Sequence, residues 1–242
     1  MSTAEPLQMR NLIVYPDSDG KPMADNTKQL RWMVVLFGNL TALFRDRPDV
    51  FVAADLLWYP LEGSPEVRTA PDVLVVFGRP KGDRGSYKQW EEDNVPLSVV
   101  FEVLSPGNTV TEMDDKRVFY EEYGVEEYYV YDPDGNHLMA FVRRGEVLRR
   151  VRPVDGFVSP RLGVRFDLSG AELVVHWPDG RHFSTFEELD TARSQAEQRA
   201  DKAEQRARRL AELGRKARQG QASAEELQEL DRLEAESGPG SP

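Results

Sequence analysis

Hydrophobic residues recur along the chain with two different periods, and each period predicts a type of element. Between residues 25 and 44 they are spaced by three and four positions, which is typical of an amphipathic helix. Three later runs, at residues 50–59, 72–77 and 97–104, are short, apolar and bounded by Pro or Gly. We expect these runs to be strands of one sheet. Because the second and third runs are apolar on both faces, helices should cover that sheet on both sides.

A strand–helix–strand unit is predicted next. The turn at residues 105–108 precedes Thr109, and Thr109 with Glu112 has the spacing of a capping box. The helix should end at Gly124, which is suited to a left-handed cap. A further strand is predicted at residues 127–131. A strand, a helix and a strand in this order predict a parallel strand pair.

The last hundred residues divide into a β-rich part and a helical tail. Short alternating stretches between residues 137 and 177 predict a small β extension. From residue 184 the composition changes to Ala, Glu, Gln and Arg, and Ser184 with Glu187 has the form of a second capping box. We therefore expect a domain over residues 1–183, with its core at residues 27–142 and the β extension at 143–183. The tail should occupy residues 184–242.

Leucine and alanine recur near the heptad spacing at residues 189–210 of this tail, which indicates a weak coiled-coil seam. Two glycines interrupt the pattern. Residues 191–218 carry an excess of basic side chains and residues 219–242 an excess of acidic ones, which favours association of the two pieces with each other or with a partner. An extended coiled coil, a helical hairpin and a solvated helical tail all remain open.

Charge and composition narrow the chemistry. With 31 Lys and Arg against 42 Asp and Glu, the net charge of −11 argues against nucleic-acid binding by bulk positive charge, although a local basic site is compatible with it. The absence of cysteine excludes disulfides, thiolate metal sites and Cys nucleophiles. No apolar run approaches the roughly 18 residues that a membrane helix needs, and residues 1–10 lack the pattern of a targeting segment. We expect a soluble, cytoplasmic protein.

Two acids occupy predicted core strands. Asp72 opens the second strand, and Glu102 lies between Phe101 and Val103 in the third. A carboxylate in an apolar strand costs several kcal/mol unless it is paired or binds a metal. Strand alternation places Glu102 on the opposite face from its two neighbours, near the end of the strand. Glu102 should therefore have a partner there.

The helix that follows offers such a partner. Glu112, Lys116 and Tyr120 share one face at i, i+4 spacing. If that face turns toward Glu102, carboxylates and one ammonium converge, an arrangement suited to magnesium, or manganese in its place, and to phosphodiester hydrolysis. In the alternative interpretation Asp72 caps a turn, Glu102 pairs with an arginine and Lys116 is a surface residue. The residues alone leave both interpretations open.

Four ordered motifs resemble those of the Uma-type putative restriction endonuclease family, within the PD-(D/E)XK nuclease superfamily. The resemblance covers roughly residues 30–142. It implies an α/β, restriction-endonuclease-like core, a mixed sheet flanked by helices. The motifs are Ala70-Pro71-Asp72 with the strand after it, Val100-Phe101-Glu102-Val103-Leu104-Ser105-Pro106-Gly107-Asn108, Lys116-x-x-x-Tyr120, and Gly124-Val125-x-Glu127-Tyr128-Tyr129-Val130-Tyr131-Asp132-Pro133.

The resemblance also implies roles for single residues. Asp72 corresponds to the PD aspartate and Glu102 to the acid of the (D/E)XK motif, whereas Leu104 stands where that motif has lysine. The family pattern supplies the lysine from the next helix, as Lys116. Catalysis is thus expected from Asp72, Glu102 and Lys116, with Mg²⁺ bound by the two acids and the backbone carbonyl of Val103. Further candidates are Glu112, Asp55 and Tyr120.

A basic, glycine-rich loop lies between the two acids. Its side chains could follow a phosphate backbone and stack on a base, although a solvated hairpin loop explains the composition equally well. The candidates are Arg79, Lys81, Arg84, Tyr87 and Lys88.

The resulting hypothesis is a nuclease that hydrolyses DNA with a magnesium-activated water. Cutting both strands of a duplex favours a homodimer. The alternative hypothesis is a catalytically silent module of the same fold that binds DNA or protein and assembles through its helical tail.

Overall fold

The chain forms two compact units, Met1–Ser184 and Thr185–Pro242. The computed structural model describes residues 13–20 and 22–235, so residues 1–10, for which the sequence predicts no targeting segment, lie outside the described part. Within those described ranges, none of the helices combines the length and the apolar character needed to cross a bilayer.

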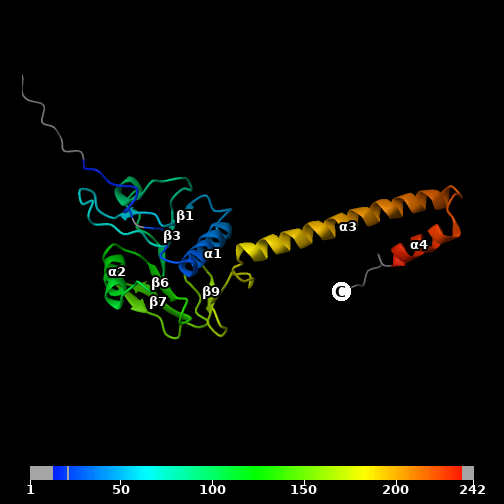
Figure 1. The fold of residues 1–242 in the computed structure, drawn as a ribbon. Helices are drawn as coiled ribbons and strands as arrows, with labels where there is room; N and C mark the ends of the chain where they lie inside the picture. Colours follow the sequence, from blue (N-terminus) through cyan, green and yellow to red (C-terminus); the bar gives the residue numbers. More distant parts are fainter. Residues whose placement is uncertain (1–12, 21, 236–242) are drawn as a thin grey trace, which may run out of the picture. The chain divides into compact units, whose positions relative to one another are not determined.

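A six-stranded mixed sheet forms the centre of the first unit, in the order β1-β3-β5-β6-β7-β8 (Figure 1). Its strands are β1 (Val50–Ala54), β3 (Val73–Phe77), β5 (Val99–Val103), β6 (Glu127–Asp132), β7 (His137–Arg144) and β8 (Val147–Arg150). β5 and β6 are parallel, and every other neighbouring pair in this sheet is antiparallel. The parallel pair is joined by α2 (Val110–Glu122), which confirms the predicted strand–helix–strand unit.

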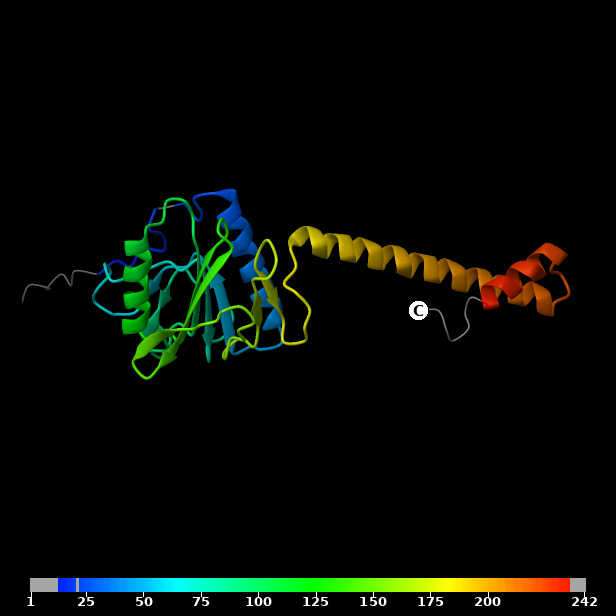
Figure 2. The ribbon, with the colours of Figure 1, turned by 90° about the horizontal axis from the view of Figure 1, so that it is seen from below.

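Helices lie on both faces of this sheet, as Figure 2 shows for α1 (Thr27–Leu43) and α2. Two small two-stranded sheets complete the layers: β9 (Arg165–Asp167) with β10 (Val174–His176), and β2 (Trp58–Tyr59) with β4 (Tyr87–Lys88), which leads into the 3-10 helix η1 (Gln89–Glu91). One hydrophobic core lies on the face of the sheet that packs against α1 and β9–β10. The second core lies on the face that packs against α2, β2 and β4. The predicted α/β architecture, a mixed sheet flanked by helices, is confirmed.

Alternation along β5 distributes its side chains between the two cores. Val99, Phe101 and Val103 join the core on the α1 side, and Val100 joins the core on the α2 side. Glu102 has the same parity as Val100, and it is hydrogen-bonded by residues of α2. The strand therefore directs a single carboxylate into the apolar layer beneath α2.

The first strand is shorter than the sequence predicts. The run at residues 50–59 breaks after Ala54, because Asp55 adopts a left-handed conformation with φ of 49° and its N–H donates to the carbonyls of Pro71 and Asp72. The chain then resumes as the short strand β2 at Trp58.

The β extension also differs from the prediction. Residues 143–144 and 147–150, assigned to it, belong to β7 and β8 and extend the central sheet. β7 pairs with β6 along the whole length of β6, and β8 pairs in turn with β7, so that both strands join the central sheet. β9 and β10 alone, among the strands described, form a separate sheet in this region.

In the second unit α3 (Phe186–Arg218) begins at a capping box formed by Thr185 and Glu188. The box lies one residue later than predicted, because the backbone N–H and carbonyl of Ser184 are both hydrogen-bonded to Asn39. A hydrogen-bond partner distant in sequence thus occupies the backbone groups of Ser184, and the helix starts one residue later.

The second unit is a helical hairpin. α3 turns at Gly220, whose φ is 67°, and α4 (Ala224–Ala235) returns beside it. The ion pairs Arg209–Glu229, at 2.7 Å, and Lys216–Glu226, at 2.6 Å, connect the basic and acidic parts of the tail. Of the three alternatives open from the sequence, the structure has the hairpin.

Candidate active site

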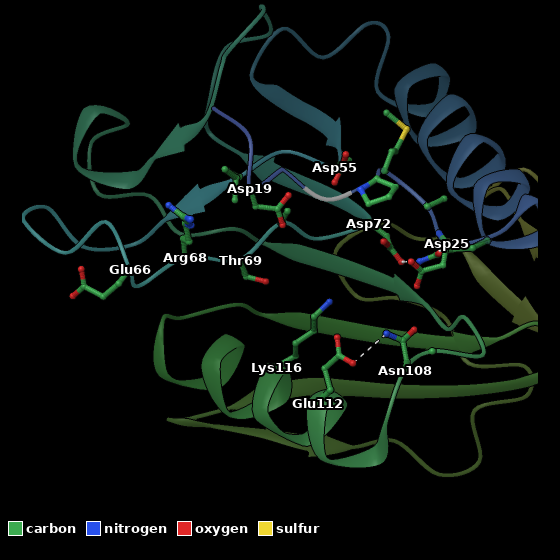
Figure 3. Close-up of a pocket in the computed structure, with 17 residues that line it drawn as sticks. Asp19, Asp25, Asp55, Glu66, Arg68, Thr69, Asp72, Asn108, Glu112 and Lys116 are labelled. Atoms are coloured by element: carbon green, nitrogen blue, oxygen red, sulfur yellow. Dashed lines mark hydrogen bonds between the residues drawn. The ribbon is translucent and has the colours of Figure 1, made fainter. Parts of the chain in front are cut away.

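A cavity of about 610 Å³ opens beside the start of α2. Figure 3 shows that side chains from α2, from the segment before β3 and from the N-terminal segment face it. Its charged lining residues are the acids Asp19, Asp25, Asp55, Glu66, Asp72 and Glu112 and the cations Arg68 and Lys116. This excess of carboxylates gives the cleft a negative potential, which concentrates cations and repels phosphate unless the charge is offset.

Asp72 precedes β3 and has 9% of its surface exposed. Its Oδ2 accepts a hydrogen bond of 2.6 Å from the backbone N–H of Val103. Its Oδ1 accepts none from any residue that the structure describes. Burial, reinforced by the nearby negative charge of Glu102, raises the pKa of Asp72 to about 7. The hydrogen bond to Oδ2 therefore holds the carboxylate in place. Oδ1 has no hydrogen-bond donor among the described residues.

Glu102 is 3% exposed, and two residues of α2 donate to it. Lys116 Nζ lies 2.8 Å from Oε2, and the Tyr120 hydroxyl lies 2.5 Å from Oε1. The i, i+4 face of α2 is thus turned toward Glu102. Within the described residues Glu102 has no arginine partner, and Lys116 is half-buried and paired with Glu102, which the alternative interpretation did not predict.

Burial and Glu102 together set the pKa of both donors. Burial alone would lower the pKa of Lys116, but the charge and the hydrogen bond of Glu102 outweigh it, so the pKa is raised. Burial, together with the charge of Glu102, raises the pKa of Tyr120 well above its ordinary value. Both side chains therefore keep their protons near neutral pH and hold Glu102 as donors.

Gln29, in the first turn of α1, is a site residue that the sequence analysis missed. Its Nε2 donates to the Val103 carbonyl at 3.1 Å and approaches Asp72 Oδ2 at 3.5 Å. A signal for it exists in the sequence, because Gln29 shares the buried stripe of α1 with Met33 and Leu36. A polar residue on an apolar stripe predicts a buried partner.

The remaining candidates near the site differ in their contacts. Asp55 and Glu112 both line the cleft. Burial, with a contribution from Asp19, raises the pKa of Asp55. Glu112 Oε2 accepts a hydrogen bond of 3.3 Å from Asn108, and the Glu112 N–H donates to the Thr109 hydroxyl at the helix start. Neither acid contacts Glu102 directly among the hydrogen bonds of the described chain.

Tyr87 does not support the predicted nucleic-acid contacts. It is fully buried, and its hydroxyl donates to the Val95 carbonyl at 2.7 Å. The prediction that Tyr87 is available to stack on a base is therefore wrong, because the ring is part of the core on the α2 side.

The basic residues of the same loop make contacts within the protein. Arg79 and Arg84 both pair with Glu92, at 2.9 and 2.6 Å, and Lys88 lies 3.5 Å from Glu91. Lys81 donates to the carbonyls of Phe44 and Arg45 that end α1. None of these side chains lines the cleft. The basic residues of this loop therefore bind acidic residues of the same segment and the carbonyls after α1.

The donors at the site fit a hard divalent cation. Two carboxylates and the Val103 carbonyl would offer oxygen atoms to such an ion, and Mg²⁺ is usually held by one or two carboxylates while it keeps several waters. Across residues 13–20 and 22–235, no three His, Cys, Asp or Glu side chains are grouped as a complete metal cage. Water and substrate would therefore have to supply much of the coordination.

Tyr120→Phe is expected to lower activity at this site about tenfold or more without unfolding the protein, because the Phe ring fills the same space but no longer orients Glu102. Steady-state kinetics check this. Tyr128→Phe is the matched control, because the Tyr128 hydroxyl is buried without a hydrogen-bond partner among the described residues; equal losses in both variants would contradict the role of Tyr120.

Asp72→Asn is expected to stabilise the metal-free protein above neutral pH. The pKa of Asp72 is about 7 in the folded state and about 3.9 when unfolded, so the folded state binds the extra proton between these values. The free energy of unfolding contributed by this group is greatest at low pH and falls, by on the order of 4 kcal/mol, as pH rises from about 4 to 7. Asn removes this dependence.

Urea unfolding in EDTA at pH 5 and pH 8, followed by tryptophan fluorescence, tests this, because all four tryptophans lie in the first unit. The two proteins should differ more at pH 8. The same pH dependence in both would show that Asp72 is ionised throughout.

The chain is similar to a known protein family and to a solved structure. Residues 19–173 match the family model Uma2, described as "Putative restriction endonuclease", and this range contains all the predicted catalytic residues. No curated protein matches the chain. A solved structure of a putative nuclease belonging to DUF820 from Anabaena variabilis is similar at 14% sequence identity and a TM-score of 0.46, covering 61% of this chain and 81% of that chain.

Proposed function

Because the chain belongs to the Uma2 family of putative restriction endonucleases, we propose that it is a metal-dependent nuclease that hydrolyses phosphodiester bonds of DNA. The observation that carries the proposal is the ion pair between the buried Glu102 and the partly buried Lys116, beside Asp72 at an acidic cleft. A buried pair of this kind is costly to maintain and is frequently found at functional sites.

The residues divide the chemistry between them. Asp72, Glu102 and the Val103 carbonyl are the ligands for Mg²⁺, or Mn²⁺, which when bound supplies Lewis acidity and an acidified water. Lys116 keeps its proton because its pKa is raised, so it acts as a hydrogen-bond donor and positive charge toward the attacking water or a phosphate oxygen, rather than as a base. Hydrolysis adds this water across one P–O bond and leaves a phosphate end and a hydroxyl end.

Supercoiled plasmid DNA tests the proposal. Purified protein with Mg²⁺ should convert it to nicked or linear forms, EDTA should stop the reaction, and added Mg²⁺ should restore it. Failure to cut double-stranded DNA, single-stranded DNA or RNA with either Mg²⁺ or Mn²⁺ would overturn the proposal. Retained DNA binding in that case would favour the silent binding module.

We also propose that the active species on duplex DNA is a homodimer, since two strands require two sites. The helical hairpin of the second unit is the candidate for self-association or for binding a partner protein. Light scattering on the full chain, compared with a chain that ends at Ser184, checks this. A monomeric mass for each of the two chains would contradict it.

A further inference from the structure

Arg68 is the second cation of the cleft, and its setting differs from that of Lys116. Lys116 is paired with Glu102, whereas Arg68 forms no ion pair with any side chain in the described part of the molecule. Its guanidinium contacts neutral groups: Nη1 donates to the Pro65 carbonyl at 3.3 Å and to the Tyr59 hydroxyl at 3.5 Å. The positive charge is held in position but is not neutralised.

The surface under Arg68 is rigid. Cζ of Arg68 lies 6.0 Å from the ring centre of Tyr59, and Tyr59 is fully buried with its hydroxyl donating to the Pro16 carbonyl at 2.6 Å. Both hydrogen bonds of the guanidinium leave from Nη1. The Nε and Nη2 donors form the other edge of the group, and such an edge matches two phosphate oxygens.

The position of Arg68 relates it to the reacting centre. It precedes Asp72 by four residues, and a chain spans at most about 3.6 Å per residue, so their Cα atoms lie within about 14 Å. In Figure 3 Arg68, Lys116 and Asp72 all border the same cleft. A DNA strand that places one phosphate at Asp72 and Lys116 therefore runs along the same cleft that Arg68 borders.

Arg68 offsets part of the negative charge of the cleft. Six carboxylates line the cavity, and Lys116 is already paired with Glu102. Every phosphate that enters meets this negative potential, and an unpaired guanidinium offsets it at one point. Phosphate contacts of this type fix the register of a strand and carry no base information.

We propose that Arg68 binds a backbone phosphate adjoining the one that is cleaved and thereby positions the DNA strand in the cleft. The inference rests on the proposed nuclease function, but it concerns binding and can be measured without cleavage.

Arg68→Gln, in the full chain, removes the charge and keeps a polar side chain. Fluorescence anisotropy with a labelled DNA duplex, in Ca²⁺ in place of Mg²⁺, should show binding weakened by about 10- to 100-fold. The slope of log affinity against log salt concentration should fall in magnitude by about 0.9, the value for one lost phosphate contact. Arg68→Lys keeps the charge but loses the two-donor edge. Its affinity for the duplex should lie between those of the wild type and Arg68→Gln.

Arg45→Gln is the matched control. It makes the same change of charge at a side chain that is 79% exposed, pairs with Asp46 and lies outside the cleft. Affinity and salt slope should stay close to those of the wild type. If Arg68→Gln behaves like this control while the wild type binds and cleaves DNA, the inference is overturned and the nuclease proposal stands. If the wild type binds DNA through Arg68 but does not cleave, the nuclease proposal fails and the phosphate contact stands; no binding at all refutes both.

Discussion

Glu102→Gln should reduce DNA cleavage by at least about 10²- to 10³-fold, the largest effect that we expect from one substitution. The amide has the same shape as the carboxylate, but it carries no charge for a metal ion and none to hold Lys116. The loss should therefore be in the rate constant of the chemical step. Single-turnover cleavage of a labelled duplex at saturating Mg²⁺ measures it directly.

Glu127→Gln is the matched control for this variant. Glu127 is also a buried glutamate of the central sheet, on the neighbouring strand β6, but its partners are Tyr129, Ser159 and the N–H of Arg161. The substitution should lower stability and leave the cleavage rate of the folded protein nearly unchanged. A comparable loss of activity in both variants would show that burial of a carboxylate, rather than the chemistry at Glu102, explains the result.

Lys116→Met should lose activity to a similar extent and should also be clearly less stable than the wild type. Met fills most of the space of the lysine stem, but Glu102 is then a buried charge without its cation. Removing one partner of a buried pair costs about 3 kcal/mol or more. Urea unfolding gives the stability, and the plasmid assay gives the activity.

The double variant Glu102→Gln/Lys116→Met separates the two effects. Its stability should recover much of what Lys116→Met loses, because no buried charge is left unpaired. Its activity should remain as low as that of either single variant. A double variant that is as unstable as Lys116→Met alone would indicate that packing of the lysine stem, and not the charge, is what stabilises the site.

Much of the central geometry followed from local rules. Strand alternation predicted that Glu102 points away from the face of Phe101 and Val103, and the i, i+4 rule placed Lys116 and Tyr120 on one face of the helix. Each relation depends on residues close in sequence, so periodicity is sufficient to predict it, whereas the contact between that helix face and Glu102 is a property of the tertiary packing. The expected role of Asp72 beside Glu102 at the same site needed the family resemblance as well.

Features set by long-range contacts could not be predicted in this way. The break at Asp55 depends on the carbonyls of Pro71 and Asp72, and Gln29 reaches Val103 from a helix 74 residues earlier. Arg79 and Arg84 belong to a loop whose composition is typical of nucleic-acid binding. Only the three-dimensional structure shows that both form ion pairs with Glu92. A propensity or a motif names a residue type, whereas the partner of a charge is a property of the tertiary structure.

The site is divided between a strand and a helix, with the acids on the sheet and the ammonium on α2. During synthesis or refolding, a chain that has formed the sheet but has not docked α2 carries the acids without Lys116 and Tyr120. Such an intermediate can still bind cations, but it lacks Lys116, the hydrogen-bond donor that the proposed reaction requires. The proposed nicking activity should consequently develop in step with the docking of α2 on the sheet.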